Sequence, residues 1–276
     1  MSAEPPHVVI KPPSRWVPLN LREVWAFRDL LTRLAIRDLK LRYKQTALGV
    51  TWVVLQPLLS AGILSFVFGT IANLPSNGVP YFVFAYVGMM AWTLFSSSLG
   101  KISGSLTGNS ALVSKIFFPR LVLPFSTVGS TMVDFVVSFA MGVVIVLVGG
   151  VRPGWALLTL PLWVAMAILL ASGVGLTAAA LAVQYRDVSQ MLPVVTQLLL
   201  YGTPIAYALS AVPKSYRLFV QLNPLAGIIE GFRWAAIDTT APSLPWAAWS
   251  AAASVLVFIA GAFVFTRRER RFADVI

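Results

Sequence analysis

The sequence predicts an all-α, polytopic membrane protein with six transmembrane helices, an amino-terminal amphipathic interface helix and re-entrant outside helices before the last span. Composition gives the first indication, because 58% of the 276 residues are hydrophobic and only 11% are charged. Soluble domains average about 25% charged residues. The chain therefore has too few polar residues to cover a soluble globule, and it is too hydrophobic to be disordered.

The second indication is a set of six apolar segments, each with the about 20 mostly apolar residues that a spanning helix requires. They cover approximately residues 47–72, 80–99, 121–149, 155–183, 191–209 and 246–266. A shorter apolar stretch, within residues 212–237, contains Glu230 and Arg233. It is too short and too polar to span alone, so we expect it to be re-entrant or interfacial.

The third indication is the placement of basic residues, which predicts that both chain ends lie in the cytoplasm. With the amino terminus inside, 17 of the 21 Lys and Arg residues fall on the inner side, as the positive-inside rule requires. This bias explains the formal net charge of +11 without a nucleic-acid partner. The first 46 residues show no cleavable signal peptide. We expect residues 1–21 to be a disordered cytoplasmic tail and residues 47–276 to form the transmembrane domain.

Residues 22–46 are expected to form a basic amphipathic helix on the inner membrane surface. Apolar residues recur at helical spacing between basic ones. This pattern suits anionic headgroups, with the apolar face sunk into the interface. The helix could be a membrane anchor alone or a docking surface for a cytoplasmic partner, and the pattern does not decide between these two.

Two inner connections carry unusual side chains. The longest, residues 100–124, has paired aromatics between cations, which could be interfacial anchors or could insert into a groove on another protein. The very short turn after the fourth span contains Tyr185, Arg186 and Asp187. Its simplest interpretation is a helical hairpin in which Asp187 caps the next helix.

Few residues could support chemistry inside the membrane. The sequence has no cysteine and one histidine, His7, so we predict no disulfide, no metal site and no histidine-based catalytic triad. Asp134 is the one acid in the middle of a predicted span. An interhelical hydrogen bond is favoured for it over a proton relay. An intramembrane glycolipid enzyme is therefore disfavoured, and no phosphate-binding loop for a nucleotide occurs.

Four pieces in order resemble one family. They are residues 37–59 (RDLKLRYKQTALGVTWVVLQPLL), 115–120 (KIFFPR), 185–188 (YRDV) and 222–235 (LNPLAGIIEGFRWA). Together they resemble the permease subunits of ABC exporters that move polysaccharides, O-antigens and teichoic acids. The resemblance implies a transporter subunit, not an enzyme, in the bacterial cytoplasmic membrane. It also implies a second copy of the chain, two cytoplasmic ABC ATPase subunits that bind ATP and Mg²⁺, surrounding membrane lipids and a lipid-linked polysaccharide substrate, with no cofactor on this chain.

The resemblance also implies roles for particular residues. Residues around 103–115 resemble a gate helix. The headgroup of the lipid would enter near Arg42, Tyr43 and Lys44, and an outside gate would include Asn223, Pro224, Glu230 and Arg233. The side chains expected to contact the ATPase lie on the two inner connections: Lys115, Phe117, Phe118, Pro119, Arg120, Tyr185, Arg186 and Asp187.

Aromatic residues make up 12% of the chain, and some could line a path for sugars. An aromatic face stacks on sugar C–H groups, while a hydroxyl or indole N–H bonds to sugar hydroxyls. The candidates are Tyr86, Trp92 and Phe95 in the second span and Tyr201 and Tyr207 in the fifth. Helix packing or an interfacial belt is the alternative for each one. Teichoic acid, a small lipid or a drug remains the alternative cargo.

Overall fold

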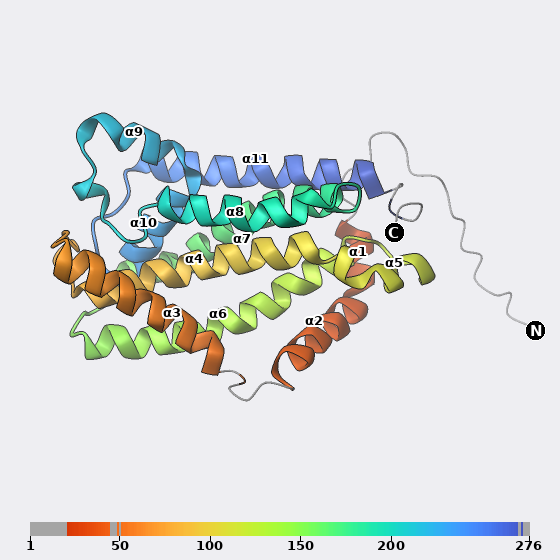
Figure 1. Cartoon of the computed structure of the whole chain (residues 1–276), viewed down its shortest axis with the longest axis horizontal. Helices are drawn as coiled ribbons and strands as arrows, with labels where there is room; N and C mark the ends of the chain where they lie inside the picture. Colours follow the sequence, from red (N-terminus) through yellow and green to blue (C-terminus); the bar gives the residue numbers. More distant parts are fainter. Residues whose placement is uncertain (1–20, 45–48, 50, 270–271, 273–276) are drawn as a thin grey trace, which may run out of the picture.

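The computed structural model describes residues 21–44, 49, 51–269 and 272, and within these residues every regular element is helical (Figure 1). Residues 1–20 of the predicted tail and residues 45–48 of the first connection lie outside the described part, whereas the last residue of the predicted tail, Leu21, begins a helix. Two short helices come first, α1 (Leu21–Ala26) and α2 (Arg28–Tyr43). The remaining helices are α3 (Thr51–Leu64), α4 (Tyr81–Gly104), α5 (Ser110–Lys115), α6 (Val122–Val148), α7 (Leu160–Ala182), α8 (Asp187–Tyr201), α9 (Lys214–Leu222), α10 (Pro224–Ile237) and α11 (Leu244–Arg268).

Five of the six predicted segments contain a helix that is long and apolar enough to cross a membrane. These helices are Thr51–Ile71, Tyr81–Gly104, Val122–Val148, Trp155–Ala182 and Leu244–Arg268. The first is α3 with a π-helical continuation, and the fourth is α7 with a short 3₁₀ turn before it. The chain is therefore a multi-pass membrane protein.

The remaining predicted segment, the fifth (residues 191–209), is a continuous helix only in its first half. Helix α8 has 15 residues and ends at Tyr201. At 1.5 Å per residue it is about 22 Å long, less than the hydrocarbon core of about 30 Å. The chain continues through non-helical residues 202–208, where Pro204 cannot donate a helical hydrogen bond. Helix α8 packs against α4 and α7, and it runs from the end near α1 and α5 to the end near α9 (Figure 1).

Helix α4 lies at the centre and packs against α3, α6, α7 and α10. One apolar core joins α4, α6, α7 and α10, and a second joins α1, α5, the ends of α4, α6 and α7 and the last turns of α11. Val24 of α1 and Phe265 of α11 belong to the second core. The described chain therefore begins and finishes at one end of the bundle, called here the α1 end. The opposite end is called the α9 end.

Helices α7 and α11 cross at glycines. A Cβ atom on Gly261 would lie 2.0 Å from the carbonyl oxygen of Gly173, and one on Gly173 would lie 2.4 Å from that of Val257. Neither contact is possible for real atoms. The two backbones touch because neither glycine carries a side chain.

Substitution of Gly261 by Ala is expected to destabilise the chain by about 2 kcal/mol, because α7 and α11 must separate. Gly62→Ala in α3 is the matched control, since nothing lies within 4 Å of its added Cβ. Thermal unfolding in detergent measures the difference. An unchanged midpoint for Gly261→Ala would contradict the close crossing.

Candidate functional site

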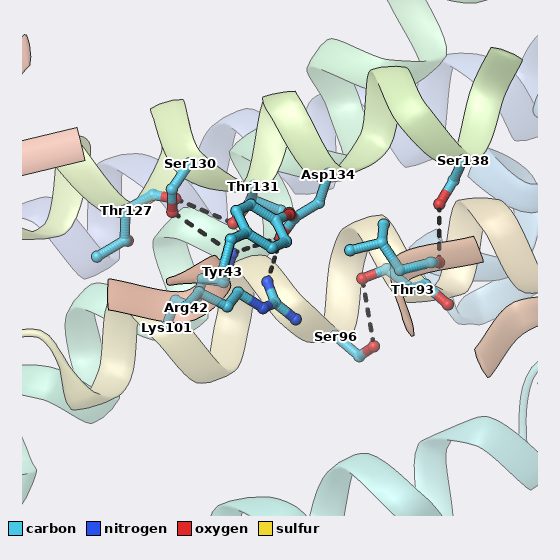
Figure 2. Close-up of polar contacts among 11 residues, drawn as sticks. Arg42, Tyr43, Thr93, Ser96, Lys101, Thr127, Ser130, Thr131, Asp134 and Ser138 are labelled. Carbon is cyan, nitrogen blue, oxygen red and sulfur yellow. Dashed lines mark hydrogen bonds and ion pairs between the residues drawn. The ribbon is translucent and has the colours of Figure 1, made fainter. Parts of the chain in front are cut away.

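Three polar side chains from α2 and α4 surround the Asp134 carboxylate of α6 (Figure 2). The Asp134 carboxylate of α6 accepts hydrogen bonds from the Arg42 guanidinium and the Tyr43 hydroxyl at the end of α2. It also accepts a bond of 2.8 Å from Lys101 Nζ at the end of α4. The predicted interhelical hydrogen bond of Asp134 is therefore confirmed. We call Arg42, Tyr43, Lys101 and Asp134 the polar node.

The cations of the polar node offset the free-energy cost of removing the Asp134 carboxylate from water. A carboxylate removed from water is costly unless it is paired and hydrogen-bonded. Asp134 has two cationic partners, and these leave one net positive charge in the polar node. Burial, reinforced by the hydrogen bond to Asp134, raises the pKa of Tyr43 to about 12. The phenol therefore stays protonated at neutral pH and keeps donating to Asp134.

Sequence reasoning placed Arg42 and Tyr43 at a headgroup entry but did not connect them to Asp134, and it missed Lys101. In the structure both α2 side chains are engaged by Asp134, whereas Lys44 is exposed. The available signal was an opposite pair of charges in neighbouring spans, Lys101 in the last turn of α4 and Asp134 in α6.

A small polar cleft adjoins the polar node between α3, α4 and α6. Ser138 lies on its wall and donates 3.3 Å to the Val53 carbonyl of α3. The polar residues that line the cleft are Arg42, Gln56, Thr93, Ser97, Thr131, Asp134 and Ser138. Figure 2 shows the labelled hydroxyls of α4 and α6 beside the polar node.

The two neighbouring phenylalanines of the first predicted inner connection differ in burial. Phe117 is 72% exposed, whereas Phe118 is 4% exposed and packs in the core of the α1 end. Arg120 places its guanidinium 5.4 Å from the Phe118 ring, and its backbone N–H donates 3.0 Å to Glu269. Burial raises the pKa of the Glu269 carboxyl. Phe118 is thus part of the internal packing of this chain, and Phe117 is the ring available to another protein.

The second connection that was predicted to be inner lies near the first, and its polar residues are exposed. Tyr185, Arg186 and Asp187 are all exposed. Arg268 of α11 donates to Gln184 at 3.1 Å, and the next residue, Glu269, accepts from Arg120, so both connections meet the end of α11. The predicted cap is wrong, because Asp187 is the first residue of α8 and no capping side chain is present.

A groove of about 720 Å³ separates α4 from α8. Hydroxyl and amide groups line much of it, and Trp92 lies on its wall. The polar lining residues are Ser96, Ser103, Thr107, Ser189, Thr196 and Gln197. Ser103 and Thr107 belong to the stretch predicted to resemble a gate helix. Sequence reasoning missed the other four, because single Ser and Thr residues in an apolar helix are ordinary.

The five aromatics predicted for a sugar path have different surroundings. Trp92 is 6% exposed and borders the groove, and Tyr201 is exposed at the end of α8. Tyr207 is half-buried, and its hydroxyl donates 3.5 Å to the Tyr201 carbonyl. Tyr86 and Phe95 are buried inside the bundle, and the Tyr86 hydroxyl donates 2.9 Å to the Ser138 carbonyl. These two rings therefore present no surface to a path in this structure.

The predicted outside-gate residues gather around the broken end of α8. Arg233 is fully buried, and its guanidinium donates 2.7 Å to the Pro204 carbonyl and 3.1 Å to Glu230. The same guanidinium bonds the Ile205 carbonyl and lies 3.6 Å from the Phe84 ring. Arg233 is therefore a buried ion-pair partner of Glu230.

Asn223 and Pro224 begin α10 beside the same segment. Asn223 Oδ1 accepts from the Leu225 N–H at 3.0 Å, so it caps α10, and Pro224 occupies the first helical position. Asn223 Nδ2 donates 3.0 Å to Thr203 Oγ1. The residues predicted for the outside gate thus hold residues 203–205 in place.

Comparison with known proteins places the chain in a family. Residues 29–237 match the family of ABC-2 type transporters. The sequence is 28% identical over 258 residues to the O-antigen export system permease protein RfbA of Myxococcus xanthus, covering 93% of this chain and 98% of that protein. It is 29% identical over 252 residues to the protein of the same name from Klebsiella pneumoniae, covering 90% and 95%. It is 25% identical over 202 residues to the polysialic acid transport protein KpsM of Escherichia coli, covering 71% and 77%. This chain is a member of the ABC-2 type transporter family.

Proposed function

We propose that this chain is the permease subunit of an ATP-driven exporter that moves a lipid-linked polysaccharide across the bacterial cytoplasmic membrane. The groove between α4 and α8 carries the proposal. A hydrated sugar chain needs hydrogen-bond partners and aromatic faces along its path. Hydroxyl groups and an amide supply hydrogen-bond partners in this groove, and Trp92, which is 6% exposed, supplies an aromatic ring on its wall. The names of the O-antigen and polysialic acid relatives support the same class of cargo.

The proposed assembly has two copies of this chain and two cytoplasmic ABC ATPase subunits, which bind ATP and Mg²⁺. Helices α3 and α8 support a second copy. Both expose large apolar side chains, such as Ile63 of α3 and Leu198 of α8, and α8 has no buried residue within the described chain. A second copy beside α8 would close the open side of the groove.

The proposed orientation puts the α1 end in the cytoplasm. The clustering of Lys and Arg residues supports it, as does the shared position of α1, the last turn of α11 and both exposed connections. In this orientation Phe117 and the turn of Tyr185, Arg186 and Asp187 face the ATPase. The net positive polar node and the exposed Lys44 then lie where an anionic lipid headgroup would arrive.

The expected effect of Phe117→Ala is loss of ATPase binding without loss of folding. Phe117 is exposed, so truncation leaves no cavity, but it removes an aromatic anchor worth about 2 kcal/mol at an interface, or roughly thirtyfold in affinity. Phe118→Ala is the matched comparison and should instead lower the unfolding temperature, since it empties a core position. Pull-down of the ATPase subunit and thermal unfolding separate the two. Equal ATPase binding by wild type and Phe117→Ala would contradict the assignment.

We further expect that α2 and α6 move as one body during transport, because the polar node ties them together. A Cβ on Gly129 would lie 3.4 Å from the Cβ of Ala35. The sequence has no cysteine, so Ala35→Cys with Gly129→Cys gives a single pair of thiols. Their oxidation to a disulfide should leave export within about twofold of the reduced protein. Export that stops on oxidation and returns on reduction would contradict joint movement.

Gene deletion tests the class of cargo in the producing bacterium. Loss of surface polysaccharide, with lipid-linked glycan accumulating inside and drug tolerance unchanged, is the expected result. Restoration by the wild-type gene is the control. Loss of drug tolerance with normal surface polysaccharide would instead identify a drug exporter.

A further inference from the structure

We propose that a cavity at the α9 end binds one sugar unit of the emerging glycan. The cavity has a volume of about 280 Å³ and lies between α9, α10, α11 and three loops. It is separate from the groove between α4 and α8, with which it shares no lining residue. The inference rests on the proposed function, because it takes polysaccharide as the cargo and the α9 end as the outer end.

The walls of the cavity combine the side-chain types that recognise sugars. Trp246 of α11 supplies an aromatic ring, and Arg217 and Gln221 of α9 supply planar polar groups. Glu230 of α10 and Asn77 of the loop after the first span complete the polar wall. Planar charged and amide groups bond pairs of neighbouring hydroxyls, while the indole face packs on C–H groups.

The polar groups are held in place without a ligand. Arg217 Nε donates 2.9 Å to the Val212 carbonyl and Nη2 donates 3.2 Å to the Ser210 carbonyl, which leaves Nη1 outside these two bonds. Ser210 Oγ donates 3.2 Å to Asn77 Oδ1. Asn77 has a φ of 56°, a left-handed conformation that Asn tolerates, and this turn directs its amide toward Ser210.

Hydrogen bonds within the chain also hold the Trp246 ring and the Glu230 carboxylate of the cavity in place. Trp246 is buried, and its Nε1–H donates 3.0 Å to the Gln221 carbonyl, so the ring cannot rotate away from α9. Glu230 is buried and uses Oε1 to bind Arg233, which leaves Oε2 outside that bond. Because little side-chain entropy remains to be lost, binding of a sugar to this cavity is favoured by pre-organisation.

Size and charge limit the ligand. Sites for drug-sized molecules occupy about 300–1,000 Å³, so this cavity has room for one sugar ring of a longer glycan. Glu230 supplies the one carboxylate of its lining residues, which are too few acids for a metal ion. The lining residues of the cavity therefore suit a sugar ring with several hydroxyl groups better than a metal cation.

Direct binding tests the proposal. The probe is the oligosaccharide repeating unit released by mild acid hydrolysis from the surface polysaccharide of the producing strain. The full-length wild-type chain in lipid nanodiscs is titrated with it by calorimetry and saturation-transfer NMR. Gln221→Trp should fill the cavity and weaken binding at least about tenfold, equal to about 1.4 kcal/mol. Ser215→Trp, on the exposed side of the same helix, is the matched control and should bind like wild type.

A second variant at the same position is needed because the introduced Trp side chain of Gln221→Trp could disturb folding. Gln221→Ala removes only the amide and should weaken binding at least about threefold, with an unchanged unfolding temperature. Absence of binding to wild type, or wild-type affinity in both Gln221 variants, would overturn the proposal. Export by wild type in proteoliposomes distinguishes the two failures: export without binding rejects this cavity alone, and absence of export rejects the proposed function.

Discussion

Asp134→Asn is expected to reduce export by at least about tenfold. The substitution preserves shape but removes the negative charge, so Arg42 and Lys101 face each other without a counterion. Breaking a fully buried pair costs about 3–5 kcal/mol. Arg42 and Lys101 are 42% and 27% exposed, so solvent screening lowers the expected cost to about 2 kcal/mol. The end of α2 should then detach from α4 and α6, and movement of the ATPase would no longer reach the bundle.

Export in proteoliposomes and ATP hydrolysis are measured together, because a merely destabilised chain would lose both. Asp134→Asn should retain ATP hydrolysis by the assembled complex while export falls. Asp134→Glu keeps the charge and should recover most of the export. Asp29→Asn is the matched control, since Asp29 is an exposed acid on α2. Normal export by Asp134→Asn would remove the polar node from the mechanism.

The second large effect is expected for Arg233→Met, which should prevent stable folding. The variant leaves the buried Glu230 carboxylate unpaired and the carbonyls of Pro204 and Ile205 without their donor. Loss of one partner of a buried ion pair costs about 3–5 kcal/mol, a large part of the stability of a typical domain. Gly88 supports this reading, because a Cβ there would lie 2.5 Å from Arg233 Nη2, so the bundle leaves room for the guanidinium.

Size-exclusion chromatography and thermal unfolding in detergent measure the effect of Arg233→Met. Arg152→Met is the matched control, because Arg152 is an exposed arginine in the loop before α7. A double variant, Arg233→Met with Glu230→Gln, should recover part of the loss, since no unpaired buried charge remains. A monodisperse Arg233→Met chain with the wild-type unfolding temperature would contradict the role of Arg233 in holding the end of α8.

Apolar length was enough to predict five of the spanning helices, because a bilayer imposes a minimum number of apolar residues on each crossing. It was not enough for α8. Pro204 signalled a break, but residues 203–205 are held by Arg233 and Asn223, which lie far along the chain. Such contacts depend on tertiary packing and leave no local pattern in the sequence.

The sequence was enough to predict which residue types belong to the candidate site, but not which of them are buried or what they contact. Phe117 and Phe118 are neighbours of identical type, and only the packing of α1, α5 and α11 decides which ring is buried. Tyr86 is the residue type expected to line a sugar path, yet it is buried and its hydroxyl donates to the Ser138 carbonyl of α6. Arg42 and Asp134 are 92 positions apart, and their pairing follows from the crossing of α2 over α6.

The central claim is that this chain forms the membrane path of a glycan exporter whose ATPase is a separate subunit. The most direct measurement reconstitutes the purified chain in proteoliposomes with its partner ATPase and follows lipid-linked glycan by accessibility to a glycan-cleaving enzyme. ATP should drive movement of the glycan across the bilayer only when both subunits are present. Movement without ATP or without the ATPase, or ATP hydrolysis with no movement of glycan, would contradict the account.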